Sequence, residues 1–308
     1  MAWLKMAAAG LLAASTTVSA QEAPAIEEAG EIIDLNRIEN YRFTVPVSIG
    51  GEGPYNFLID TGAQATVLSR ELADLLGVEN RRPATLVGMN SSEQVEVAPI
   101  SDFALGARMF DIMSAPLVAQ ANIGSADGVL GVDSLQEQRV LFDFDNRTIE
   151  VADASTLGGN RGFEIIVRAR RQFGQLIITE ASLNGIDVSL ILGTGSEGSI
   201  GNRELERRLR ARIAGDAEVT DINGAEENTQ LRMARNLRIG RAKVSQMPIG
   251  FVDSPTFELL GLEDEPAILL GMNELRLFRR VAIDFEDRRV LFDLPSRESR
   301  TSRRRDDS

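Results

Sequence analysis

Short apolar runs separated by polar and turn-forming residues dominate the chain from about residue 42 onward. Glycine, asparagine, aspartate and proline interrupt these runs, and long stretches with helical spacing are few. Such runs are typical of β-strands, so the pattern predicts an all-β fold. Two stretches indicate helices instead, residues 70–76 before Gly77 and residues 203–213 before Gly215, because glycine is favoured just after a helix C-terminus.

An internal repeat organises this pattern into two halves. Four blocks recur in the same order: 56–69 with 189–202 and 88–93 with 221–226 at an offset of 133, 127–131 with 267–271 at 140, and 139–147 with 280–288 at 141. A duplicated β unit with small insertions accounts for this series. We therefore expect two homologous β halves, at residues 38–153 and 163–294, joined by the glycine-rich stretch 157–162.

Turn-forming residues stand between apolar runs at 143–147 and 284–288. Each is expected to form a hairpin that closes its half. Two segments, 90–92 and 146–148, also fit the N-glycosylation pattern. Because such short patterns are common by chance, both are interpreted as turn chemistry.

The first 20 residues have the layout of a cleavable export signal. Lys5 supplies an early positive charge, residues 6–14 are apolar or small, and the segment ends in Val-Ser-Ala. The alternative is a membrane anchor, but it needs roughly 20 consecutive apolar residues, and the run at 6–14 is far shorter. We therefore expect cleavage near Ala20 and a periplasmic or extracellular mature protein. The arginine-rich and serine-rich end, residues 295–308, predicts a disordered tail.

The composition restricts the available chemistry. The 308 residues contain no histidine and no cysteine, and Lys243 is the only lysine after the predicted signal. This excludes thiolate nucleophiles, histidine-based triads and zinc sites with nitrogen or sulfur ligands. The net charge of −13 opposes binding to nucleic acid or anionic membranes. Any catalysis must therefore use carboxylates or a hard metal held by oxygen ligands. We expect no cofactor, no nucleic-acid partner and no stable membrane insertion.

Acidic residues cluster at 226–227 and 263–265. Neither cluster has the alternating spacing of a calcium-binding loop. We interpret both as solvated turns and expect no metal site.

The strongest chemical signal lies at residues 57–63. An apolar strand ends in Asp60, and Thr-Gly-Ala follows, so a carboxylate stands at a strand end close to backbone N–H groups. Here the chain resembles the aspartic proteases of the pepsin and retropepsin kind. The resemblance implies that the two halves are β-barrel lobes facing a central cleft, with a flap hairpin at 86–97 and a segment at 129–131 that packs behind the loop. It also implies that Asp60 is catalytic, one of two aspartates that share a proton and hold the attacking water.

The second copy departs from this pattern at one position. Gly193 stands where the repeat places the partner of Asp60, while the residues that support the turn are present in both loops, as Thr61, Gly62, Thr194 and Gly195. Without a second carboxylate, Asp60 is expected to stay ionised at neutral pH. Residues 193–198 also fit a dinucleotide-binding pattern, but no helix is expected directly after them, and the repeat explains their glycines.

By the same resemblance, four residues are candidate substrate contacts: Gln64, Gly88, Met89 and Glu197. Gln64 and Glu197 occupy equivalent positions after the two loops. For Glu197 two alternatives stay open, a solvated side chain or a substitute for the missing carboxylate.

Two functions remain open at this point. The first is an exported aspartic-type endopeptidase that acts on extended peptides through Asp60. The alternative is a pseudoprotease that binds peptides in the inter-lobe cleft, because Gly193 replaces the second aspartate. A homodimer could pair two Asp60 residues only by displacing the chain's own second lobe, so we expect a monomer whose partner is a peptide or protein substrate.

Overall fold

The computed structural model describes residues 31–34, 36–38, 42–153 and 155–295. The predicted export signal and nearly all of the predicted tail lie outside these residues. Within them, no helix combines the length and the apolar character needed to cross a bilayer.

The first half forms a closed β-barrel. Its strands follow the order β3-β4-β9-β5-β8-β7, a pairing of β3 with β7 closes the ring, and β2 and β6 extend it. The strands are β2 Asn36–Ile38, β3 Arg42–Ile49, β4 Glu52–Ile59, β5 Val67–Ser69, β6 Arg82–Val87, β7 Ser92–Leu105, β8 Arg108–Val118 and β9 Gly128–Leu130. Three short helices accompany them: α1 Arg70–Leu75, α2 Gln120–Ile123 and α3 Val132–Leu135.

The second half repeats this barrel. The order is β13-β14-β19-β15-β18-β17, a pairing of β13 with β17 closes the ring, and β16 extends it. The strands are β13 Gln175–Leu183, β14 Ile186–Leu192, β15 Ser199–Gly201, β16 Arg212–Thr220, β17 Glu226–Ile239, β18 Ala242–Phe251 and β19 Ala267–Leu270. The helices are α4 Arg203–Arg208, α5 Pro255–Leu259 and α6 Met272–Leu275.

The sequence offsets reappear as structural equivalences. Helices α1 and α4 are related by 133 positions, and α3 and α6 by 140. The same side-chain cap begins α1 and α4, since Ser69 accepts a hydrogen bond from Leu72 N and Asn202 accepts one from Leu205 N. The predicted all-β, two-lobed architecture is confirmed.

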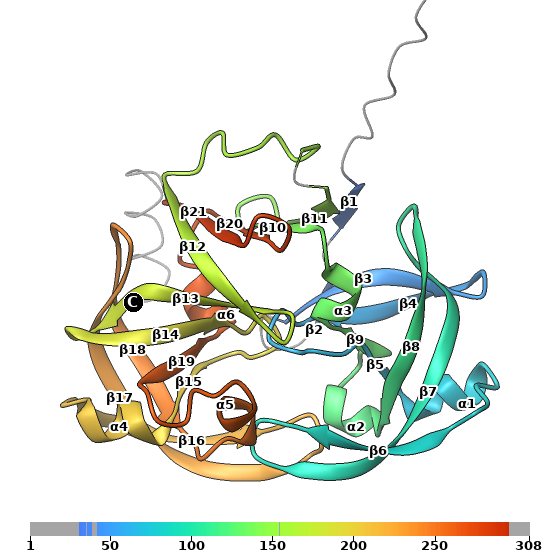
Figure 1. Cartoon of the computed structure of the whole chain (residues 1–308), viewed down its shortest axis with the longest axis horizontal. Helices are drawn as coiled ribbons and strands as arrows, with labels where there is room; N and C mark the ends of the chain where they lie inside the picture. Colours follow the sequence, from blue (N-terminus) through green and yellow to red (C-terminus); the bar gives the residue numbers. More distant parts are fainter. Residues whose placement is uncertain (1–30, 35, 39–41, 154, 296–308) are drawn as a thin grey trace, which may run out of the picture.

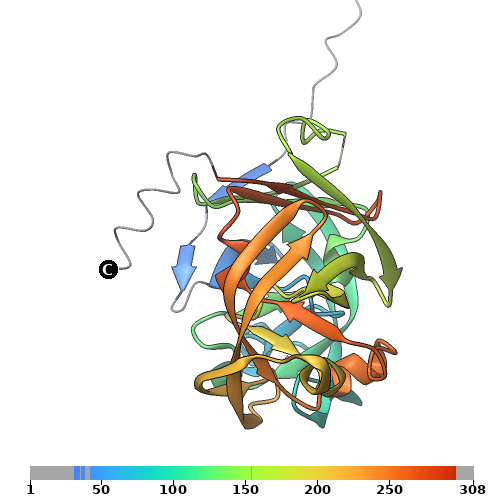
Figure 2. The ribbon, with the colours of Figure 1, turned by 90° about the vertical axis from the view of Figure 1, so that its left-hand side faces the viewer.

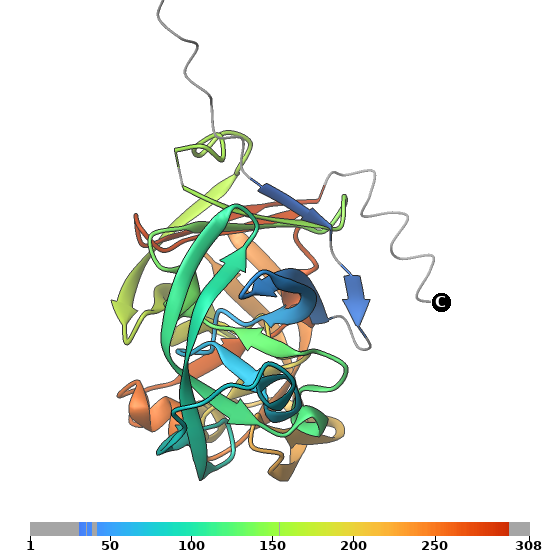
Figure 3. The ribbon, with the colours of Figure 1, turned by 90° about the vertical axis from the view of Figure 1, so that its right-hand side faces the viewer.

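A third sheet joins the lobes, in the order β1-β11-β10-β20-β21-β12. Its strands are β1 Glu31–Asp34, β10 Arg139–Asp143, β11 Thr148–Ala152, β12 Ile165–Gln172, β20 Arg280–Asp284 and β21 Arg289–Asp293. The sheet lies across one end of both lobes, and the tips of the β6–β7 and β16–β17 hairpins meet at the opposite end (Figures 1, 2 and 3).

The hairpins at 143–147 and 284–288 are thus present, but the expectation that each closes its own half is wrong. Strand β10 pairs with β20 of the other half, which sets Arg139 opposite Asp284. These two side chains form a buried ion pair at 2.6 Å. The backbone edges of the two hairpins therefore bind each other and fix the lobes together.

The helix expected over 203–213 ends early. Helix α4 stops at Arg208, and Leu209 takes an extended conformation that places its side chain in the core, where it is 3% exposed. From Arg212 the chain continues as β16. Gly215, at φ 152°, sits at an irregularity of the β16–β17 pairing and ends no helix.

Candidate active site

Asp60 lies directly after β4, at the junction of the two lobes. Its backbone N–H donates to the Leu130 carbonyl at 3.0 Å, so β9, which runs parallel to β4, holds the loop from behind. Its Oδ1 accepts hydrogen bonds from Gly62 N at 2.8 Å and from Gly195 N at 3.1 Å. The carboxylate is therefore held by the loops of both halves.

Two threonines lock these loops together. Thr61 donates from its backbone N–H to Thr194 Oγ1 at 2.9 Å and from its hydroxyl to the Leu192 carbonyl at 2.8 Å. Thr194 donates in return to the Ile59 carbonyl at 2.8 Å. Both threonines are buried, so these hydrogen bonds fix the position of Asp60 relative to the second lobe.

Gly193 occupies the place of the second carboxylate, and Leu269 fills the space that such a side chain would need. A Cβ added to Gly193 would lie 2.3 Å from Leu269 Cδ2 and 2.6 Å from its Cγ. The backbone of Gly193 does not adopt the left-handed conformation that favours glycine. The obstacle to an aspartate at this position is therefore the packing of Leu269.

The first lobe has a smaller residue at the position equivalent to Leu269. Leu269 pairs across the sheet with Ile191, and its counterpart Val129 pairs in the same way with Leu58. Valine is one methylene shorter than leucine, so the first lobe has the smaller side chain at this position. The aligned blocks of the repeat already display this difference, but its meaning depends on the packing direction of Leu269, which the sequence does not give.

Each half of the chain matches a family of aspartyl proteases. Residues 45–137 match the family of gag-polyprotein aspartyl proteases, and residues 179–273 match an aspartyl protease family. The chain thus belongs to the retropepsin-like aspartyl proteases. No curated protein matches this retropepsin-like chain.

In this retropepsin-like chain a side-chain hydroxyl lies behind the equivalent glycines Gly131 and Gly271. Gly131 N donates to Thr66 Oγ1 and Gly271 N donates to Ser199 Oγ, both at 3.0 Å. In the second lobe Ser199 in turn donates to the carboxylate of Glu274. Burial raises the pKa of Glu274 to about 7, although the hydrogen bond from Ser199 opposes this rise.

The two candidate contacts that follow the loops lie differently. Gln64 is half-buried, whereas Glu197 is exposed and accepts a hydrogen bond from Asn273 N through its backbone carbonyl. An exposed carboxylate is not held in place to share a proton with Asp60. The geometry therefore favours the solvated alternative for Glu197.

The two candidate contacts at the first flap tip reach across to the second lobe. A hairpin is formed by β6 and β7, where the flap was predicted, and its tip contains Gly88 and Met89. The Gly88 carbonyl accepts a hydrogen bond from Thr256 Oγ1 at 2.9 Å. Met89 packs against an apolar cluster of the second lobe that includes Leu269.

Gln175 is a further site residue that sequence reasoning missed. It lies at the start of β13 and is 1% exposed, and its Nε2 donates to the carbonyl of Gly62, two residues after Asp60. Its Oε1 is buried without a hydrogen-bond partner. The repeat offers no signal for this role, because the equivalent position in the first half is Arg42.

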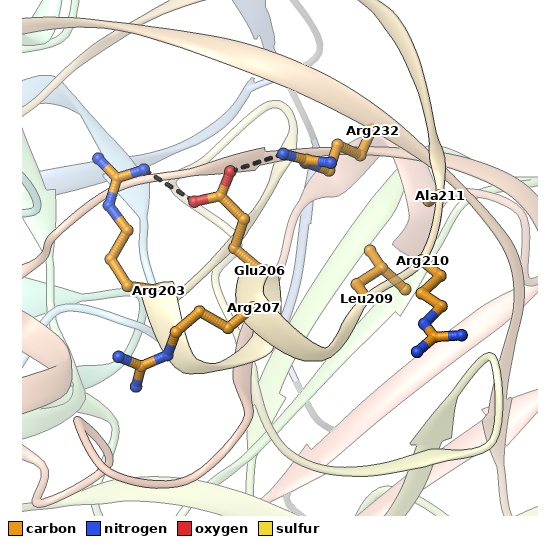
Figure 4. A pocket seen from close by; sticks show the side chains of 7 residues that line it. All are labelled: Arg203, Glu206, Arg207, Leu209, Arg210, Ala211 and Arg232. Carbon is orange, nitrogen blue, oxygen red and sulfur yellow. Dashed lines mark hydrogen bonds and ion pairs between the residues drawn. The ribbon is translucent and has the colours of Figure 1, made fainter.

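A hollow of about 650 Å³ lies at α4, away from Asp60, and four arginines line it. Figure 4 shows Arg203 and Arg232 directed at Glu206, whereas Arg207 and Arg210 point elsewhere. Because the guanidinium groups do not converge on one point, this hollow does not have the geometry of an anion site.

Proposed function

We propose that this retropepsin-like chain is an exported protein that binds extended peptides between its lobes, and that a single chain does not hydrolyse them through paired aspartates. One observation carries the second part. Leu269 fills the space beside Gly193, so that the two interlocked loops present one carboxylate, Asp60, instead of two. Two-aspartate chemistry needs a shared proton, and this arrangement has no second carboxylate to share it.

Peptide binding is supported by the edges of the two flaps, the β6–β7 hairpin and its repeat equivalent, the β16–β17 hairpin. Strands β6 and β16 are the outermost strands of their sheets, so no strand pairs with their outer sides, although near the tips the Leu86 and Val219 carbonyls accept hydrogen bonds from the opposite flap. Extended peptides commonly add to such edges through main-chain hydrogen bonds. Because these hydrogen bonds are made by the main chain, peptide binding of this kind does not require the missing second carboxylate.

The endopeptidase remains the second candidate because the Asp60 loop is complete. The carboxylate is half-buried at the lobe junction and is oriented by Gly62 N and Gly195 N. A general base held in this way could still activate water, at a lower rate than a pair.

A degenerate peptide library separates the two functions. The purified mature protein is incubated with the library from pH 3 to pH 7, with and without a pepsin-type transition-state inhibitor, beside Asp60→Asn. Binding to both proteins without cleavage supports the proposal. Cleavage that the inhibitor blocks and that Asp60→Asn abolishes supports the endopeptidase. If neither protein retains or cleaves any peptide, both functions are wrong.

Export is part of the proposal and has its own test. The layout of the first 20 residues is typical of a cleaved signal. Mass spectrometry of protein recovered from outside the cytoplasm should find an N-terminus at or near Gln21. An intact Met1 on such protein would contradict cleavage.

A further inference from the structure

The tips of the two flaps, the β6–β7 and β16–β17 hairpins, bind each other. Asp221, at the tip of the β16–β17 hairpin, accepts hydrogen bonds at Oδ2 from Asn90 N at 3.0 Å and from Ser91 Oγ at 2.8 Å. Its Oδ1 accepts two more, from Asn223 N and Ala225 N of its own turn. Asp221 is only 5% exposed, so its charge is satisfied mainly by these four donors.

Two asparagines make the contact reciprocal. Asn90 Nδ2 donates to the Val219 carbonyl at 2.6 Å, and Asn223 Nδ2 donates to the Leu86 carbonyl at 3.3 Å. Both the asparagines and their acceptors are related by the repeat offset of 133 positions. We call the four residues Asn90, Ser91, Asp221 and Asn223 the flap-tip clasp.

Each flap tip also inserts an apolar side chain into the opposite lobe. Met89 packs on the second-lobe cluster that contains Leu269, and Ile222 packs on the first-lobe cluster that contains Leu58 and Val129. Ala63, in the Asp60 loop, packs on the same cluster as Ile222. The chain therefore fills with its own side chains the apolar surfaces that border both loops.

The closed arrangement contains an unfavourable feature as well. The amide oxygens Asn90 Oδ1 and Asn223 Oδ1 are buried without a hydrogen-bond donor. Leaving a buried acceptor unsatisfied costs free energy. The N–H groups of a peptide main chain are donors of the kind that these oxygens lack. The two unsatisfied amide oxygens therefore destabilise the closed flap tips, and a bound peptide could remove this destabilisation by donating hydrogen bonds to them.

We propose that the flap-tip clasp is an autoinhibitory latch, which keeps Met89 and Ile222 in the cleft until a peptide displaces them. This inference rests on the proposed function, because it identifies how access to the same cleft is regulated. It requires the clasp to open while the barrels and the inter-lobe sheet stay folded.

An engineered disulfide tests the latch in both directions. A Cβ added to Gly88 would lie 2.9 Å from Asp221 Cγ, which brings the two Cβ atoms near the separation of roughly 3.5–4.5 Å that a disulfide spans. The chain has no cysteine, so Gly88→Cys/Asp221→Cys would contain a single pair. Its oxidised form locks the flap tips together, and its reduced form lacks the Asp221 carboxylate.

Hydrogen–deuterium exchange of residues 86–93 and 219–226 measures opening without any ligand. Against wild type, Asn90→Ala and the reduced double variant should exchange at least about tenfold faster there, and the oxidised form should be protected. Amides of β10 and β20 should be unchanged in all forms. Gln94→Ala, which loses a hydrogen bond within the first flap only, is the matched control and should behave as wild type.

A fluorescently labelled statine-containing peptide then reports access to the cleft. It should associate faster with Asn90→Ala than with wild type, and reduction should restore association that the oxidised double variant lacks. Equal tip exchange in Asn90→Ala and wild type overturns the latch, as does equal association with the oxidised variant and wild type. If exchange changes as expected but no form binds this probe or the peptide library, the clasp does hold the flap tips together, but the proposed function and the autoinhibitory role that rests on it both fail.

Discussion

Restoring a carboxylate at position 193 requires two substitutions, because Leu269 occupies the space. Gly193→Asp alone would place a Cβ 2.3 Å from Leu269 Cδ2, and such overpacking costs about 1–3 kcal/mol. Leu269→Val reproduces the Val129 side chain of the first lobe and removes one methylene, at a cost of about 1 kcal/mol. We therefore expect Gly193→Asp/Leu269→Val to be better folded than Gly193→Asp.

The double variant should also gain peptidase activity. A correctly placed general acid or base typically contributes about 10²–10⁴-fold in rate, so the gain should be far above the wild-type rate. Two carboxylates at the lobe junction would share one proton, because both cannot ionise easily, and the activity should therefore be highest at acidic pH.

The assay is cleavage of a quenched fluorescent peptide between pH 3 and pH 7, after thermal melting has shown that each variant is folded. Gly193→Asn/Leu269→Val is the matched control, since it has nearly the same shape without the carboxylate. Adding Asp60→Asn to the double variant should abolish the gain. A folded double variant that is no more active than its asparagine control at any pH would refute the reasoning that packing at Leu269 keeps the second carboxylate out.

Three further predictions concern stability and are checked by urea unfolding. Glu274 has a folded pKa of about 7, above its ordinary 4.5, so its contribution to stability falls as pH rises between these values. Glu274→Gln should match wild type near pH 5 and be more stable at pH 8, by at most about 3 kcal/mol; equal differences at both pH values would contradict this. Asp284→Ala should cost about 3–5 kcal/mol because it strands a buried arginine, whereas Asp287→Ala, at an exposed pair, should cost less than about 1 kcal/mol. Gly195→Ala would place a Cβ 2.3 Å from Asp60 Oδ2 and should cost about 1–3 kcal/mol, unlike Gly62→Ala, whose contacts begin at 3.2 Å.

The repeat predicted the two-lobed architecture because it identifies equivalent residues in the two halves, and this does not require knowing which strands pair. Matching the Asp60 loop to 189–202 divides the chain into two halves, and the local pattern adds one helix to each, whereas α2, α3, α5 and α6 are not predicted. The family resemblance then predicted the flap and the packing segment at 129–131, and the structure has a hairpin and a buried strand at these places.

Two of the failures involve contacts between the halves, and the third involves the burial of a core side chain. The pairing of β10 with β20 is a choice of partner more than a hundred residues away, which the local turn signal at 143–147 does not contain. Asn90 was interpreted as turn chemistry, yet its amide binds the other flap. The helix beginning at Arg203 was predicted too long, because a run of helix-forming arginines outweighed Leu209, whose burial requires an extended backbone.

The loss of one carboxylate changes what the second loop does for the first. Thr194 still holds the Asp60 loop, and Gly195 N still donates to Asp60 Oδ1, so the second loop supports the remaining carboxylate without contributing one. A second buried carboxylate would repel Asp60 or require a shared proton, and Leu269 replaces that unfavourable interaction with apolar packing. The same cluster receives Met89 from the first flap. Leu269, which occupies the space that a second carboxylate would need, therefore also belongs to the apolar cluster that receives the first flap tip, and this links the proposed lack of paired-aspartate hydrolysis to the packing of the closed flap.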